Sequence, residues 1–246
     1  MTLPSAVTRR DGWFYASMAF LCAAVVILGF GRSFYLRAWF PEHARTVAQE
    51  PIFLWHGAAF TAWFALLCLQ PLLAKHGALR WHRRLGFLGA AVAGSAFVLG
   101  AAGAVTAAGR PGGFLGAPFP PYVLLANLLA GLVLYAGLVA AAIVLRRDGP
   151  SHKRLVLLGS LSILDAAATR WPFEFASLDS PIPGFANADL VVFALLLPQI
   201  VWDLATLRRL HPATVIGSLA IVWVFAVRND LGETQAWTRL AAWWVG

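Results

Sequence analysis

The feature that most constrains this chain is a series of long apolar segments, because a helix needs about 20 such residues to cross the hydrocarbon core of a bilayer. Charged residues make up only 12% of the 246 residues, against about a quarter in soluble domains, and hydrophobic residues make up 60%. This composition excludes a soluble domain, a disordered chain and a coiled coil. Apolar runs bounded by charge or by Gly and Pro predict seven spans, at 14–36, 52–74, 84–107, 122–145, 154–173, 187–207 and 213–227.

The expected fold class is therefore all-α, a polytopic membrane protein in which residues 1–246 form a single integral membrane domain. An up-down arrangement of neighbouring spans predicts a four-helix core made of spans two to five. The last residues carry Trp237, Leu240, Ala241 and Trp244 at helical spacing. This pattern predicts a short C-terminal helix that lies in the membrane interface.

Basic residues predict the orientation, since Lys and Arg are enriched in cytoplasmic loops. With a cytoplasmic N-terminus, every double-basic pair falls on the inner side, from Arg9-Arg10 to Arg208-Arg209, and Asp203 is expected to pair with the last of them. The pattern predicts a protein of the bacterial inner membrane with a periplasmic C-terminus. The net charge of +8 is then interpreted as a cytoplasmic rim that faces anionic lipid, and no nucleic-acid partner is expected.

One internal repeat singles out two histidines. Residues 81–90 read WHRRLGFLGA and residues 151–160 read SHKRLVLLGS, so that His82 matches His152. Each copy opens a helix that runs outward from the cytoplasm, and in an up-down bundle the two helices lie on a diagonal. Both imidazoles are therefore expected at the same depth, where two inward-facing rings would bind haem iron from both axial positions or hold a smaller metal ion.

Basic side chains flank both histidines and would pair with haem propionates or lipid phosphate, namely Arg83, Arg84, Lys153 and Arg154. The alternative interpretation is structural. A histidine beside basic residues at the inner end of a span is also typical of an interfacial residue whose neighbours extend toward the headgroups.

Ionisable and polar residues inside the apolar segments suggest a second site, because such residues are costly in lipid. Asp165 and Arg170 are five residues apart in the fifth span and are expected to pair with each other. His56 lies about one turn into the second span, and Gln70 follows it near the inner end. These four residues are predicted to form a polar membrane site.

Three stretches resemble a group of uncharacterised bacterial inner-membrane proteins, namely WHGAAFTAWFALLCLQPLL, RWHRRLG and SHKRLVLLGSLSILDAAATR. Members of that group carry a His-Gly helix with a following Gln, a His-Arg-x-Leu-Gly start and a His-Lys-Arg-Leu start followed by an Arg. The resemblance covers most of the chain and implies no known activity.

More distantly, the chain resembles the transmembrane ascorbate-reducible b-type cytochromes, whose four-helix core holds two haems between diagonal helices. The fourth span has no histidine here. The resemblance therefore implies at most one bis-histidine haem, between His82 and His152.

Two functions are favoured, and a third, weaker interpretation is an assembly or scaffold subunit. The first is a haem b or metal-binding protein of electron transport, acting as a redox component or a haem-dependent enzyme. The second is a non-redox carrier or channel whose polar path runs through Asp165, Arg170, His56 and Gln70. A quinone or other small-molecule substrate, a partner subunit and a homo-oligomer are the partners expected besides lipid.

Overall fold

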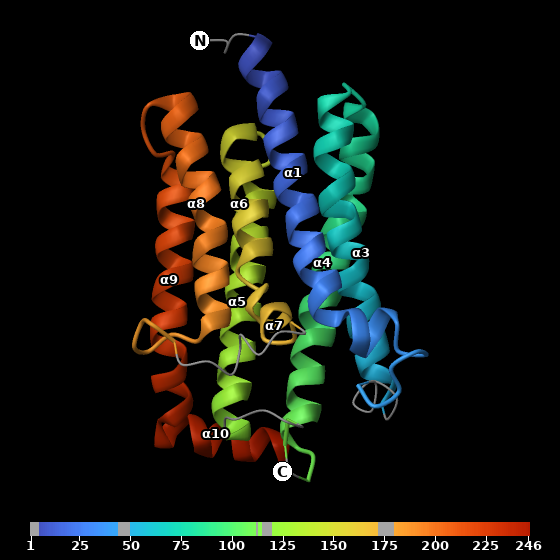
Figure 1. The fold of residues 1–246 in the computed structure, drawn as a ribbon, viewed down its shortest axis with the longest axis vertical. Coiled ribbons are helices and arrows are strands. Elements are labelled where there is room, and N and C mark those ends of the chain that lie inside the picture. The colour runs from blue at the N-terminus through green and yellow to red at the C-terminus, as the bar shows by residue number, and fades with distance from the viewer. Residues whose placement is uncertain (1–4, 44–49, 112, 115–119, 172–179) are drawn as a thin grey trace.

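The computed structural model describes residues 5–43, 50–111, 113–114, 120–171 and 180–246 (Figure 1). Long helices run roughly parallel to one another, and the N-terminus and C-terminus lie at opposite ends of the bundle. We call these the N-terminal end and the C-terminal end. The elements are α1 (Ser5–Phe30), the π-helical turn η1 (Gly31–Tyr35), α3 (Pro51–Lys75), α4 (Leu79–Ala108), α5 (Pro121–Val144), α6 (Gly149–Leu161), α7 (Asp165–Ala168), α8 (Asn187–Leu207), α9 (Pro212–Glu233) and α10 (Gln235–Val245).

The described part of the chain is helical, and six of its helices are long and apolar enough to cross a membrane. They are α1 together with η1, α3, α4, α5, α8 and α9. The sequence predicts a seventh span at 154–173, but the structure has the short helix α6 there, then a turn and the four-residue helix α7. Residues 172 and 173 of that predicted span lie outside the described residues.

Local hydrogen bonds account for the break after α6. The hydroxyl of Ser162 donates to the carbonyl of Gly159 at 2.8 Å, and the amide of Leu164 donates to Leu161 in a tight turn at 3.1 Å. Serine side chains that bond nearby carbonyls compete with regular helix geometry. Hydropathy cannot register this competition, because the residues on both sides of the break are apolar.

The short helix α6 lies at the centre of the molecule. On one side, α1, α3, α4, α5 and α6 form a ring in which each element packs against the next, and α6 closes the ring against α1. On the other side, α6 packs against both α8 and α9. Eight of its thirteen residues are buried. The core is therefore not confined to the four segments predicted, since α1, α8 and α9 share it.

Small residues on α4 allow close contact with α5 and α3. The buried face of α4 carries glycine and alanine at intervals of three and four residues, at Gly89, Ala93, Ala96, Gly100 and Gly103. A Cβ at Gly100 would lie 3.0 Å from the Leu132 side chain of α5 and 3.5 Å from His56 of α3. Small residues permit such approaches between membrane helices, as the sequence predicts for this span.

The helix α10 lies across the C-terminal end of the bundle, roughly perpendicular to the other helices (Figure 1). The indole of Trp237 donates to the carbonyl of Tyr122 at 2.7 Å, which fixes α10 to the start of α5. Trp243 and Trp244 remain exposed. Tryptophans at this position are typical of a membrane–water boundary.

Candidate functional site

The two repeated histidines meet at the N-terminal end of the bundle. His82 is in the first turn of α4 and His152 in the first turn of α6, and their ring centres lie 6.4 Å apart with the ring planes at 83°. His82 shares a hydrogen bond of 3.2 Å between its Nδ1 and the carbonyl of Gln70. His152 does the same with Ala142 at 2.9 Å. With Nδ1 donating to a carbonyl, each neutral ring keeps its Nε2 lone pair for another partner.

Both backbone carbonyls belong to the preceding helix. Ala142 lies in the last turn of α5, where carbonyls have no partner inside the helix, whereas Gln70 lies five residues before the end of α3. The two histidines therefore bond carbonyls at different distances from the end of the preceding helix. Within the described residues, neither Nε2 atom has a hydrogen-bond partner.

The four flanking basic residues have different surroundings in the two copies. In the first copy, Arg83 and Arg84 are exposed, and the Arg84 guanidinium lies 5.6 Å from the centre of the Trp81 ring. In the second copy, Lys153 forms an ion pair with Asp11 of α1, and Arg154 is 2% exposed. Arg83 and Arg84 thus stand open to a ligand, whereas the other two are held by carboxylates.

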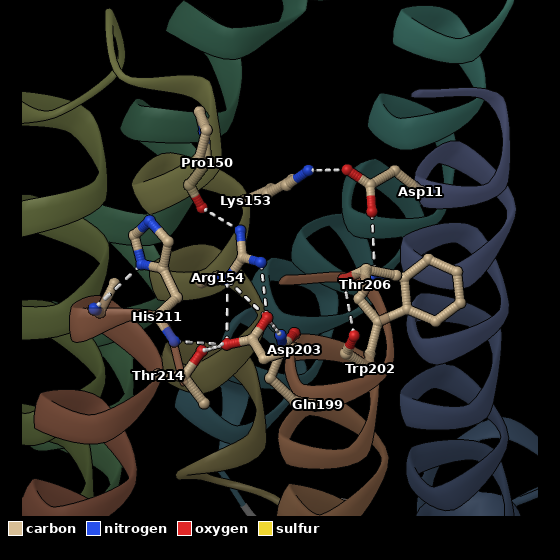
Figure 2. A network of polar contacts seen from close by, with 11 residues as sticks. Asp11, Pro150, Lys153, Arg154, Gln199, Trp202, Asp203, Thr206, His211 and Thr214 are labelled. Atoms are coloured by element: carbon tan, nitrogen blue, oxygen red, sulfur yellow. Dashed lines mark hydrogen bonds and ion pairs between the residues drawn. The ribbon is translucent and has the colours of Figure 1, made fainter. Parts of the chain in front are cut away.

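The Arg154–Asp203 ion pair fastens α6 to α8 (Figure 2). The Nη2 atom of Arg154 donates to Asp203 at 2.5 Å and its Nε at 3.0 Å, and the carboxylate is fully buried. Asp203 also accepts bonds from the Gln199 side chain, the His211 amide and the Thr214 hydroxyl. Asp203 therefore pairs across helices with Arg154, rather than with the neighbouring Arg208-Arg209 pair that the sequence suggests.

A second contact ties α1 to the same place. The Asp11 carboxylate pairs with Lys153 and accepts a bond of 2.8 Å from the indole of Trp202. The Phe14 ring stacks on Trp202 with the ring centres 4.5 Å apart. Figure 2 shows both networks side by side at the start of α6. The helix that carries His152 is thus held from two directions.

A second buried arginine joins the break after α6 to α8 and α9. Arg228 of α9 donates to Asp165 at 2.7 Å and to Asp189 at 2.5 Å. Its Nε is buried and has no hydrogen-bond partner among the described residues. The predicted pairing of Asp165 with Arg170 is therefore replaced by a bond to Arg228, 63 residues further along the chain. The sequence contains one indication of this pairing. Asp165, Asp189 and Arg228 all lie in apolar segments, where charges have to be neutralised by other residues of the protein.

His56 and Gln70 lie on one face of α3, separated by fourteen residues, with Phe60 and Trp63 between them. Both aromatic rings contact Tyr135 of α5, at 6.1 Å and 5.4 Å between ring centres. Nδ1 of His56, the side-chain oxygen of Gln70 and the hydroxyl of Tyr135 are buried without a hydrogen-bond partner in the described structure. The interior of the helix ring thus contains a line of unsatisfied polar atoms.

Arg170 lies near His56 but is not joined to it by a hydrogen bond. Its guanidinium donates to the carbonyl of Ala166 and lies 4.9 Å from the centre of the Phe30 ring. It is within electrostatic reach of both Asp165 and His56. The four predicted polar residues therefore form two groups, with Asp165, Arg170 and His56 toward the C-terminal end and Gln70 beside His82.

No protein-family model, curated protein or solved structure matches this chain. The family resemblance drawn from its motifs stays a prediction.

We expect Arg154→Met to destabilise the protein by about 3–5 kcal/mol, because it leaves the buried Asp203 carboxylate without its counter-charge. The matched control is Arg84→Met, the same position in the other copy of the repeat, where the side chain is exposed. Thermal unfolding in detergent measures both. Equal losses in the two variants would contradict a special role for the Arg154–Asp203 pair.

His211 makes the stability of this region depend on pH. Its Nδ1 accepts the amide of Ala213 at 3.2 Å at the start of α9, so the ring must be neutral. Burial and the nearby Arg154 lower the pKa of His211, with Lys153 acting in the same direction and Asp203 and Asp148 opposing it. Because the unfolded chain then binds a proton more readily than the folded one, stability falls as the pH drops below about 6.5.

The variant His211→Asn isolates this effect, since asparagine also caps helices but does not titrate. We expect a smaller loss of unfolding temperature between pH 7 and pH 5.5 than in the unsubstituted protein. His76→Asn, at an exposed loop position, is the control and should keep the original pH dependence. If the unfolding temperatures of both variants fall equally between pH 7 and pH 5.5, His211 does not cause the pH dependence.

Proposed function

We propose that this chain is an integral membrane protein that binds haem b between His82 and His152 and takes part in electron transfer. The observation that carries the proposal is the pairing of these rings, each with Nδ1 bonded to a backbone carbonyl. A hydrogen bond to one ring nitrogen fixes the tautomer and the orientation of a histidine that binds metal through the other. Both rings are oriented in this way by their own helix starts.

The spacing of the rings fits a shared metal. Two metal–nitrogen bonds of about 2.0 Å, with about 1.1 Å from each nitrogen to its ring centre, separate the ring centres by about 6 Å. The observed separation is 6.4 Å. The same separation also falls within the usual range of about 4.5–7 Å for two packed aromatic rings, so the hydrogen bonds of the Nδ1 atoms carry the proposal.

The surface of α4 below His82 also suits a flat group. Gly86 and Gly89 follow His82 at one and two turns, and a Cβ at Gly89 would meet no atom within 4 Å. A Cβ at Gly86 would meet only the Gln70 side chain, at 4.0 Å. Arg83 and Arg84 at the same helix start have no carboxylate partner within the described ranges, so they are the residues that would bind propionates.

His82 and His152 would hold the haem, and the chemistry that the group would supply is the exchange of single electrons. The chain's own residues would orient the two imidazoles and neutralise the propionates. The packed side chains of Trp63, Tyr135 and Leu138 would exclude water from the interior.

The test is an absorption spectrum of detergent-purified protein, oxidised and then reduced with dithionite. We expect a Soret band that is lost in His82→Ala and in His152→Ala, because either change removes one of the two side chains that would hold the haem. His76→Ala, an exposed histidine in the turn between α3 and α4, should keep the band. Folded protein that is colourless and free of iron by elemental analysis would overturn the haem proposal, and a different bound metal would point to the smaller ion.

A second candidate, a carrier or channel for a small polar molecule, is favoured by one specific observation. The helix break at Ser162 lies beside the buried Asp165–Arg228–Asp189 cluster, and interrupted helices with charged residues are typical of transporter binding sites. His56 and Gln70 have buried polar atoms that a passing solute would satisfy.

This candidate predicts that Asp165→Asn changes substrate flux in reconstituted vesicles while His82→Ala does not. The haem proposal predicts the reverse for the Soret band. Loss of flux in both variants, or in neither, would count against a path through Asp165.

A further inference from the structure

Arg154 and Arg170 hold their guanidinium groups in the same way. Nη1 of Arg154 donates to the backbone carbonyl of Pro150, four residues earlier, and Nη1 of Arg170 donates to the carbonyl four residues before it, that of Ala166. The Nε and Nη2 atoms of Arg154 form a fork on the Asp203 carboxylate, at 3.0 Å and 2.5 Å. The same two atoms of Arg170 have no acceptor within the described ranges. Arg170 therefore presents the same fork that Arg154 uses to bind a carboxylate.

The end of α1 holds the Arg170 guanidinium in place. The group lies 4.9 Å from the centre of the Phe30 ring, an arrangement typical of a cation–π contact. One residue before Phe30, a Cβ on Gly29 would overlap the carbonyl of Ala167, so α7 is packed directly against α1. Figure 1 shows α7 beside that end of α1. A fork that is already held in position loses little freedom when it binds a ligand.

A ligand can reach Arg170 from outside the protein. Its side chain is exposed, and the bond from Nη1 to Ala166 lies at the surface. Arg154, by contrast, is 2% exposed and is enclosed together with its carboxylate. Arg170 also lies beside the point where α1 gives way to the π-helical turn η1, and such turns occur frequently at functional sites. The two arginines therefore differ in access, and only the fork of Arg170 is open to an external partner.

The charges around Arg170 favour a negatively charged partner. Loss of water around the guanidinium lowers the pKa of Arg170, and the nearby Asp165 offsets this only in part. Asp165 is itself bonded to Arg228 at 2.7 Å, so its charge is shared between two arginines. His56 is also within electrostatic reach, and an imidazole is neutral or positive but never negative. An anion on the fork would supply the counter-charge that Asp165 does not.

We propose that Arg170 binds an oxyanion, a phosphate or carboxylate group that places two oxygens on Nε and Nη2. The planar fork of an arginine matches the two oxygens of such a group, whereas a single neutral carbonyl would bring no counter-charge. The group belongs either to a small anion from the aqueous phase or to the headgroup of an anionic lipid, because both present the same oxygens. The site is independent of haem binding, since His82 and His152 lie at the N-terminal end of the bundle.

Isothermal titration calorimetry of protein purified in a non-ionic detergent tests the site with inorganic phosphate as the probe. We expect one phosphate per chain. Arg170→Gln removes the charge and the fork, and should weaken binding by about tenfold or more, as expected for hydrogen bonds to a charged group. Arg170→Lys keeps the charge but loses the fork, and should also bind more weakly. Arg37→Gln is the matched control, because it removes an exposed arginine that follows the same end of α1, and it should bind phosphate as before.

Native mass spectrometry with dioleoyl phosphatidylglycerol distinguishes the two sources of the oxyanion. Retention of one such lipid, lost in Arg170→Gln, would identify a lipid headgroup as the partner, whereas phosphate binding without lipid retention would identify a soluble anion. The proposal is overturned if neither probe binds, or if both bind Arg170→Gln as well as the unsubstituted protein.

A carboxylate of the chain itself is the remaining competitor for the fork. Glu174 lies outside the described residues and is four positions from Arg170 in the sequence. Phosphate that binds only after Glu174→Gln would overturn the proposal, because the fork would then belong to Glu174. His82→Ala should bind both probes as before, so that failure of haem binding is distinguishable from failure of this site.

Discussion

Charges inside a membrane protein must be neutralised by the protein itself, and here that requirement is met by two buried arginines and the carboxylates of α8. Asp203 near the end of α8 holds Arg154 of α6, and Asp189 near its start holds Arg228 of α9. The helix α8 is therefore fastened at both ends by ion pairs. Because Asp165 also binds Arg228, the interrupted helix α6 has one buried ion pair in its first turns and another directly after its end.

The histidine pair depends on this arrangement. His152 is two residues before Arg154, so the position of its ring relative to His82 is set by the same turn of α6 that Asp203 holds. The contacts of Asp11 with Lys153 and Trp202 fix that turn from the side of α1. Eight of the thirteen residues of α6 are buried against neighbouring helices. The charged contacts at its start add to this packing and help to hold the His152 ring 6.4 Å from that of His82.

The sequence predicts the helical membrane architecture and the meeting of His82 and His152, because both depend on patterns within the chain: apolar length in the first case, a repeated motif in the second. It does not predict the break after α6, where apolar residues continue past Ser162. It also treats Arg84 and Arg154 as equivalent, although one is exposed and the other buried. Arg154 is buried because other helices enclose α6. Its partner Asp203, and Arg228 as the partner of Asp165, come from distant segments of the chain, so residue spacing does not reveal these ion pairs.

The two candidate functions require different polar groups on the inner face of α3. Each buried polar atom without a partner costs about 1–3 kcal/mol, and His56, Gln70 and Tyr135 contribute three such atoms to the interior of the helix ring. Apolar residues of similar size would avoid that cost, so the chain retains these groups at the expense of stability. Gln70 links both functions, since its carbonyl orients His82 while its side-chain oxygen stays unsatisfied. For an electron-transfer protein, only the carbonyl of Gln70 is needed, and any residue at that position supplies one. The amide side chain is needed only if the interior of the ring also receives a polar molecule, which makes the side chain of residue 70 the part of the site that separates the two functions.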